Sequence, residues 1–257
     1  MRTLPLLIAV VVVSHVVTAA DMKPADIIAK SEAAYAAVKS YEGTTTVRSK
    51  SEIGDSKLDQ TATAKITFVR PGKMRIEGKD TGSRPYAIIS DGKDTWRSWP
   101  LENAGAFKKD QSLMMAVATM TGVAGLAPTY IHSALMTPGA ASPFAIGRTG
   151  TAKLMGHEKV DGADCHIVVA DASSAKNTYW IDSATFLLRR MKEEQNEKQL
   201  AAASERAQEA MKNVGKGKNL PDISAMKLKS MERVHSFQID RVNGTPDAKL
   251  FADPTKK

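Results

Sequence analysis

Apolar and polar residues alternate along residues 61–100, and this alternation predicts a series of short strands. In Thr61–Arg70 every second residue is apolar, ending with Ile66 and Phe68. A period of two is typical of a strand that is buried on one face. Pro71-Gly72 and Asp91-Gly92 supply turn residues, so the segment is expected to fold back on itself repeatedly. The result is an antiparallel meander with one apolar face, which the rest of the chain has to cover.

A helix is predicted before this meander and further strands after it. Pro24 suits the first turn of a helix over residues 25–41, and Gly43 is expected to end that helix. Strand-like patterns return over residues 145–191 and 226–240. The predicted fold is therefore mixed α+β, mainly antiparallel β, with helices against one face of the sheet.

Two apolar segments, residues 111–120 and 128–136, are predicted to be covering helices. They are apolar nearly all round, and a helix of that kind has to be buried. The first contains Met114 and Met115, and methionine is a flexible side chain that recurs on surfaces accepting varied apolar ligands. The segments suit an ordinary core plug, and a plug that also forms an adaptable ligand wall is the alternative.

The N-terminus predicts export. Arg2 is followed by an apolar run over residues 4–17 and by the small residues Thr18-Ala19-Ala20, which is the pattern of a cleaved signal peptide over residues 1–20. The apolar run is shorter than the roughly 20 residues of a membrane span. No cysteine follows it that could carry a lipid anchor. We therefore expect an exported protein that is soluble after signal cleavage.

Length and charge narrow the class of protein further. The chain has 257 residues, which suits one domain of mixed or all-β type over residues 21–257. A solvated amphipathic helix is expected as an insertion at about 193–219. The net charge of +8 would suit an anionic membrane surface or nucleic acid. Because the charges are spread and no nucleic-acid-binding motif is present, we expect no nucleic-acid partner.

The sequence lacks the patterns typical of catalysis and metal binding. His132, His157, His166 and His235 show no metal-ligand spacing, and Cys165 lies in a strand-like run where a small buried hydrophobe is expected. There is no Gly-x-Ser-x-Gly elbow and no Gly-x-Gly-x-x-Gly fingerprint. We therefore expect no metal, no cofactor and no enzymatic activity, and a binding function is favoured.

Two ordered motifs resemble those of periplasmic carriers that sort outer-membrane lipoproteins (the LolA/LolB-like family). They are Arg-Pro-Gly-Lys-Met-Arg at residues 70–75 and Ile-Ser-Asp-Gly-Lys-Asp-Thr-Trp at residues 89–96; Trp180-Ile181-Asp182 followed by Leu188-Arg189-Arg190 is also similar. The resemblance implies an unclosed β-barrel, or half-barrel, whose concave face is plugged by helices and binds acyl chains. It also implies that Arg70, before the proline, acts in holding and releasing acylated cargo. The inserted helix and the few aromatic residues on the inner strands depart from the family pattern.

The candidate site is an acyl cavity over the apolar face of the meander. Alternation places Arg70 on the same side as Phe68, where a charge has to be paired or to bind a ligand. In the alternative interpretation, the Arg70 side chain reaches solvent at the strand end. The complete set of residues predicted to line the cavity is Arg70, Phe68, Met74, Ile76, Tyr86, Ile88, Trp96, Trp99, Met114 and Met115.

Two functions remain open at this stage. The first is a soluble periplasmic carrier or binding protein for acyl chains or lipoproteins. The second is a non-enzymatic envelope-stress or regulatory module of the same fold, whose partner would be an envelope membrane protein. In both cases we expect a monomer.

Overall fold

The structure is a computed structural model, and it describes residues 22–80, 82–100, 105–117, 134–136, 143–145, 151–173, 175–202, 205 and 228–256. Strands dominate these residues. In chain order the elements are α1 (Pro24–Ala37), β1 (Ser40–Ile53), β2 (Ser56–Val69), β3 (Lys73–Lys79), β4 (Pro85–Asp91), β5 (Thr95–Ser98), β6 (Lys108–Asp110), β7 (Thr151–Val160), β8 (Ala163–Asp171), β9 (Lys176–Asp182), β10 (Leu188–Asn196), β11 (Leu228–Val242) and the short 3-10 helix η3 (Ala248–Phe251).

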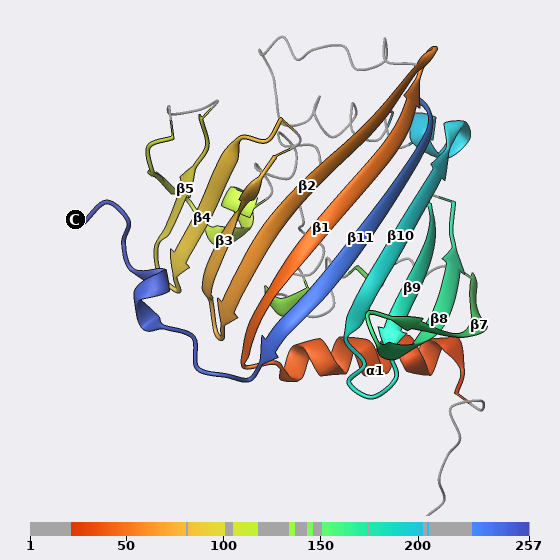
Figure 1. Cartoon of the computed structure of the whole chain (residues 1–257), viewed down its shortest axis with the longest axis horizontal. Coiled ribbons are helices and arrows are strands. Elements are labelled where there is room, and N and C mark those ends of the chain that lie inside the picture. The colour runs from red at the N-terminus through yellow and green to blue at the C-terminus, as the bar shows by residue number, and fades with distance from the viewer. Residues whose placement is uncertain are drawn as a thin grey trace, which may run out of the picture.

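The strands form one antiparallel sheet of 11 strands in the order β6-β5-β4-β3-β2-β1-β11-β10-β9-β8-β7 (Figure 1). The last strand, β11, pairs with the first, β1, and joins the two halves of the sheet. The outermost strands, β6 and β7, are not hydrogen-bonded to each other, so the barrel is unclosed. The expected half-barrel of mainly antiparallel β structure is confirmed.

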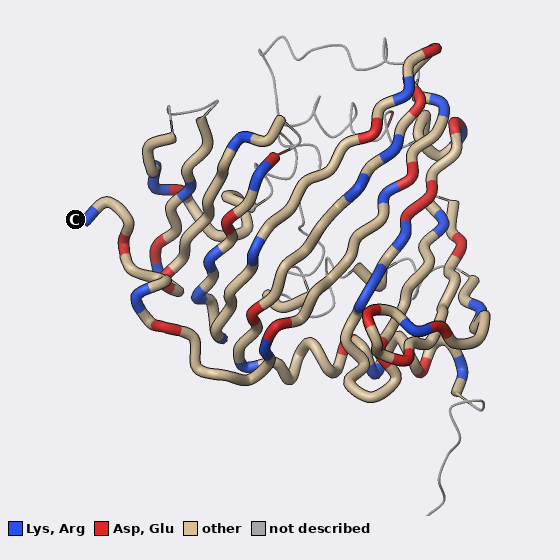
Figure 2. The backbone as a smooth tube through the Cα atoms, viewed as in Figure 1, with Lys and Arg blue, Asp and Glu red and all other residues tan. Residues whose placement is uncertain are grey.

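One face of the sheet, called here the inner face, carries the main core. Tyr41 and Val47 of β1 are fully buried, whereas Arg48 and Lys50 on the opposite, outer face are exposed. The pairing register places buried residues of neighbouring strands beside one another, as Phe68 lies opposite Tyr41. Lysine, arginine, aspartate and glutamate are interspersed along β1, β10 and β11 (Figure 2), as expected for strands with one solvated face.

Helices cover the inner face, as predicted. Ile27, Ile28 and Tyr35 of α1 belong to the same buried cluster as the inner residues of the sheet. The short helical segments 113–117 and 134–136 also contribute residues to this cluster. α1 runs across the ends of the strands (Figure 1), so it touches parts of the sheet that are far apart in the chain.

The C-terminal segment covers part of the outer face beside β3 and β4. Phe251 of η3 is buried, and Arg75 of β3 donates a hydrogen bond to the carbonyl of Leu250 (2.9 Å). Ile89 of β4 pairs with Trp96 of β5, and both are buried although they lie outside the main cluster. At Ile89 and Trp96 the outer face of β4 and β5 is therefore buried as well.

The predicted end of the first helix is wrong. α1 ends at Ala37, and Tyr41 and Gly43 belong to β1. Gly43 lies at a register shift between β1 and β11, where an added Cβ would be 2.5 Å from the carbonyl oxygen of Gln238. The glycine therefore allows close strand packing and does not end a helix.

The predicted start of the inserted helix is also wrong. Residues 193–196 continue β10, because their pairing with β11 extends to Asn196 opposite Ser230. Residues 197–202 are helical. The rest of the expected insertion, apart from residue 205, lies outside the described residues, as does the expected signal peptide. Within the part of the chain that is described, no helix is long and apolar enough to cross a membrane.

Gly78 provides a test of the close approach of β2 and β3. An added Cβ would overlap the carbonyl oxygen of Thr63 and lie 3.0 Å from Ala64. Because backbone atoms yield little, Gly78→Ala should lower the free energy of unfolding by roughly 1–3 kcal/mol, measured by urea denaturation. Gly72→Ala is the matched control, since its Cβ would be 3.6 Å from Gly92. Equal losses in the two variants would contradict the assigned packing.

Candidate functional site

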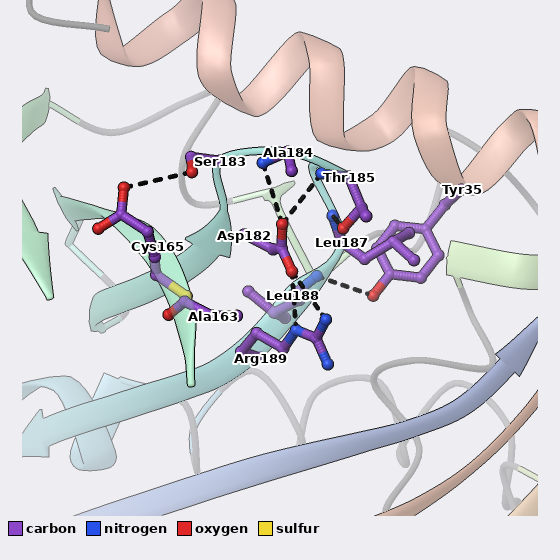
Figure 3. Close-up of polar contacts among 11 residues, drawn as sticks. Tyr35, Ala163, Cys165, Asp182, Ser183, Ala184, Thr185, Leu187, Leu188 and Arg189 are labelled. Carbon is purple, nitrogen blue, oxygen red and sulfur yellow. Dashed lines mark hydrogen bonds and ion pairs between the residues drawn. The ribbon is translucent and has the colours of Figure 1, made fainter. Parts of the chain in front are cut away.

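The turn between β9 and β10 holds α1 against the sheet. Ser31 of α1 donates a hydrogen bond to the carbonyl of Phe186 (2.7 Å). The hydroxyl of Tyr35 accepts one from the amide of Leu188 (3.1 Å; Figure 3). Lys30 lies 5.0 Å from the ring centre of Phe186. The helix is thus docked by directional polar contacts as well as by apolar packing.

Asp182 organises this turn. One carboxylate oxygen accepts hydrogen bonds from the amides of Ala184 and Thr185 at 3.0 Å, and the other accepts from the guanidinium of Arg189 at 2.7 and 3.0 Å (Figure 3). Burial acts to raise the pKa of Asp182, but these hydrogen bonds together hold it below its ordinary value. The ionised carboxylate therefore stabilises the turn to which α1 is attached.

Arg70 holds the C-terminal end of α1. Its Nε donates to the carbonyl of Val38 (2.9 Å), and its Nη2 donates to the carbonyl of Tyr35 (3.1 Å). Carbonyls at the end of a helix lack partners within the helix, and a cation there also interacts favourably with the helix dipole. The guanidinium lies 5.3 Å from the ring centre of Phe68, so the two side chains are on the same side, as alternation predicted. Arg70 thereby links β2 to α1.

Most of the predicted cavity residues lie together on the inner face. They belong to one buried cluster, and none is more than 6% exposed. Pairing places Ile66, Ile76 and Ile88 opposite one another across β2, β3 and β4. The predicted residues brought together are Phe68, Met74, Ile76, Tyr86, Ile88 and Trp99.

Trp99 is fixed by the buried carboxylate of Asp80, which the sequence analysis did not single out. Trp99 Nε1 and Arg84 Nε donate to one oxygen of Asp80 at 3.1 and 2.7 Å. The other oxygen accepts from the amides of Gly82 and Arg84 at 2.9 Å. Burial acts to raise the pKa of Asp80, but these hydrogen bonds hold it below its ordinary value. The indole therefore has a fixed orientation in the cluster.

Trp96 is not part of this wall, contrary to the prediction. It pairs with Ile89, whereas Ile88 pairs with Arg97, and directly paired residues point to the same face of a sheet. Trp96 therefore lies on the outer face. The inner position is taken by Arg97, whose charge is compensated there by Asp110 at 2.5 Å.

Met114 and Met115 are not part of the buried wall either. Their side chains are 57% and 50% exposed, whereas Ala116 and Val117 are buried. The prediction that this segment is buried on all sides is wrong, because the single turn over residues 113–117 presents only one face to the core. Of the second apolar segment, only residues 134–136 are described.

The sequence analysis missed inner residues of β1 and of the strands β9 to β11. Tyr41, Tyr179 and Met191 belong to the main cluster, and His235 is 1% exposed beside it. Burial lowers the pKa of His235 to about 3, so the imidazole is neutral near pH 7. Alternation in β9, where Tyr179 and Ile181 are both buried, was the available signal.

The described residues contain no group of three or more His, Cys, Asp or Glu placed to hold a metal ion. Cys165 is fully buried, as predicted, and burial raises the pKa of its thiol to about 11. Such a thiol is protonated at neutral pH and behaves as a small apolar side chain.

A family model described as "Predicted periplasmic protein (DUF2092)" matches residues 25–209. The chain belongs to this family. Its periplasmic description agrees with the export expected from the N-terminal sequence and with the location that the resemblance implied, so the DUF2092 protein is assigned to the periplasm. No curated protein matches the chain.

Several solved structures are similar to this DUF2092 chain over most of its length. A LolA superfamily protein from Nitrosomonas europaea is 12% identical with a TM-score of 0.34, covering 90% of this chain and 98% of that one. LprF from Mycobacterium bovis is 9% identical with a TM-score of 0.45, covering 90% and 96%. The matching chain in the MucA/MucB complex of Pseudomonas aeruginosa is 14% identical with a TM-score of 0.43, and the match covers 90% of this chain and 61% of that one. The half-barrel itself is shown by the pairing of this chain's own strands.

Asp182 should make folding stability depend on pH. Since its pKa is lowered in the folded state, its contribution is fully present above the unfolded value near 3.9 and is lost as the pH falls through the folded value. Asp182→Asn should cost roughly 1.5–3 kcal/mol at neutral pH. The difference from wild type should shrink below about pH 4 in denaturant titrations.

Asp55→Asn is the matched control, because that carboxylate is fully exposed in the turn between β1 and β2. A loss of stability that stays constant from pH 7 to pH 2 would show that the Asp182 carboxylate does not act through its charge.

Proposed function

We propose that this periplasmic protein is a non-enzymatic binding module that carries acyl chains or acylated proteins on its inner face. The observation that carries the proposal is the continuous apolar cluster between an unclosed sheet and α1, which includes Phe68, Met74 and Ile88. Ligand sites are typically concave and mainly apolar. The two motifs that resemble lipoprotein carriers lie on the strands that build this cluster.

Loading requires a change in the covering helices. The six predicted residues that lie together on the inner face are nearly inaccessible in this structure, so an acyl chain has to displace part of what covers them. α1 is attached at its C-terminal end by two hydrogen bonds from Arg70 to the carbonyls of Val38 and Tyr35. Each is worth about 1 kcal/mol net, which suits an attachment that opens reversibly. We therefore propose that Arg70 acts by controlling the movement of α1.

The proposed function predicts that lipid co-purifies with the protein. Protein isolated from the periplasm should give native mass spectra with added masses that fragment to acyl chains. Delipidated protein is the control, and its spectra should show the added masses again after incubation with membrane lipids. A stable complex with the periplasmic segment of an envelope protein, without lipid, would contradict the carrier function and favour the regulatory one.

Arg70 should control the rate of ligand exchange. Arg70→Leu removes both hydrogen bonds to α1 and keeps apolar bulk, so a fluorescent fatty acid should associate and dissociate about tenfold faster in stopped-flow measurements. Hydrogen exchange of the α1 amides should accelerate as well.

Arg75→Leu is the matched control, since that guanidinium binds the carbonyl of Leu250 on the outer face. Its exchange rates should equal those of wild type. If Arg70→Leu loses stability but exchanges ligand at the wild-type rate, Arg70 has only a structural role.

A further inference from the structure

The inner face is not apolar along its whole length. Ser49, Arg233, Glu193 and Asn177 form one register row across β1, β11, β10 and β9. We call these four residues the polar row. All except Arg233 are buried, and an Nη of Arg233 lies 3.7 Å from a carboxylate oxygen of Glu193. The adjacent row towards α1 includes Val47 and Met191, so the change from apolar to charged takes place between neighbouring rows.

The polar row has hydrogen-bonding capacity that the protein does not use. Asn177 is 2% exposed, and its Oδ1 has no hydrogen-bond partner in the protein. Its Nδ2 donates to the hydroxyl of Tyr179 (3.0 Å), which fixes the amide. Nε of Arg233 is also buried without a partner. Leaving such atoms unpaired is costly, and this points to a polar ligand group that pairs with them.

The polar row leads to an open cavity at the end of the barrel away from α1. This cavity of about 770 Å³ is lined by Ser51, Met231 and Gln195, which follow the polar row on the same strands and the same face. Its wall also carries charges of both signs, among them Lys176 and Glu52. β1 begins near the end of α1 (Figure 1), and its residues Ser51 and Glu52 line this cavity.

The apolar part of the inner face is long enough for an acyl chain. From Tyr41 to Val47 the strand β1 spans about 20 Å at roughly 3.3 Å per residue. An amphiphile lying along the strands would therefore place its chain near α1 and its head group at the polar row. The row offers a guanidinium, a carboxylate and an amide oxygen, so it complements a head group that carries both an anion and a cation.

We propose that the polar row is a head-group site for a zwitterionic lipid, with Arg233 pairing with the phosphate and Glu193 with the ammonium. This inference rests on the proposed binding of acyl chains to the same face. The head group then projects into the cavity lined by Ser51 and Met231, at the opposite end from Arg70. A fatty-acid carboxylate would meet Glu193 without offering it a cation, and it would bind less well.

Two lysophospholipids of equal chain length test the assignment. Lysophosphatidylethanolamine and lysophosphatidylglycerol share the phosphate, and only the first carries an ammonium. The affinities are measured by competition against a fluorescent fatty acid. Glu193→Gln should lower the affinity for the ethanolamine lipid by about tenfold and leave the affinity for the glycerol lipid unchanged. Arg233→Gln should lower the affinity for both lipids by about tenfold.

The outer face offers matched control variants. Arg190 and Glu158 form an ion pair of the same length, 3.7 Å, on that face. Glu158→Gln and Arg190→Gln should leave both affinities unchanged. If the affinities for both lipids are the same in Glu193→Gln and Arg233→Gln as in wild type, the head-group site is overturned while the acyl-carrier function stands. If none of these amphiphiles binds the wild-type protein, both proposals fall.

If Glu193→Gln or Arg233→Gln fails to fold, a measurement on the wild-type protein tests the head-group site instead. A lysophosphatidylethanolamine with a nitroxide on its head group should broaden the amide NMR signals of Ser51 and Met231. The signals of Ser31 and Tyr35 in α1 should keep their widths. Broadening confined to α1 would place the head group at the Arg70 end and overturn the assignment.

Discussion

The attachment of one helix to an unclosed sheet is the constraint on which the rest of the structure depends. A closed barrel hides its inner face by curvature, but a half-barrel leaves that face to be covered by other elements. α1 does so by reaching from Arg70, which follows β2, to the turn that follows β9. Because β1 and β11 pair between these two points, the helix and the sheet form a closed set of contacts around the apolar cluster.

Buried carboxylates secure both halves of the sheet in the same way. Asp80 follows β3 and Asp182 ends β9, and each accepts hydrogen bonds from two backbone amides and one arginine. Asp80 also binds the indole of Trp99, whereas the turn at Asp182 presents Leu188 to Tyr35 of α1. In each case the desolvation of the carboxylate is offset by several hydrogen bonds, so the turn is held in one conformation. The apolar wall and its helix are thus both positioned by polar turns.

The sequence predicted the sheet and most of the wall, because alternation and turn residues are local signals. It failed for β5, where Thr95, Trp96 and Arg97 are all buried and alternation therefore does not identify the inner side. The residues that determine the burial of these positions are distant in sequence. The C-terminal segment covers the outer face beside β3 and β4, and Asp110 compensates the charge of Arg97. Arg70 was placed on the correct side, but its partners are carbonyls of α1. Any residue type supplies a carbonyl, so no pattern of side chains reveals them.

In the proposed function, the docked helix and the ligand compete for the same apolar face. The apparent affinity for a ligand then falls as the docked state becomes more stable, because binding has to supply the free energy of opening. Part of the opening cost is the apolar packing that Ile27, Ile28 and Tyr35 lose, and part is the hydrogen bonds that attach α1. The hydrogen bonds from Arg70 and Ser31 are made to the protein itself, so they add to this opening cost without recognising the ligand. Recognition is left to the other end of the inner face, where Arg233 and Glu193 lie away from the helix. The chemistry of exchange and the chemistry of selection are therefore separated along the length of the strands.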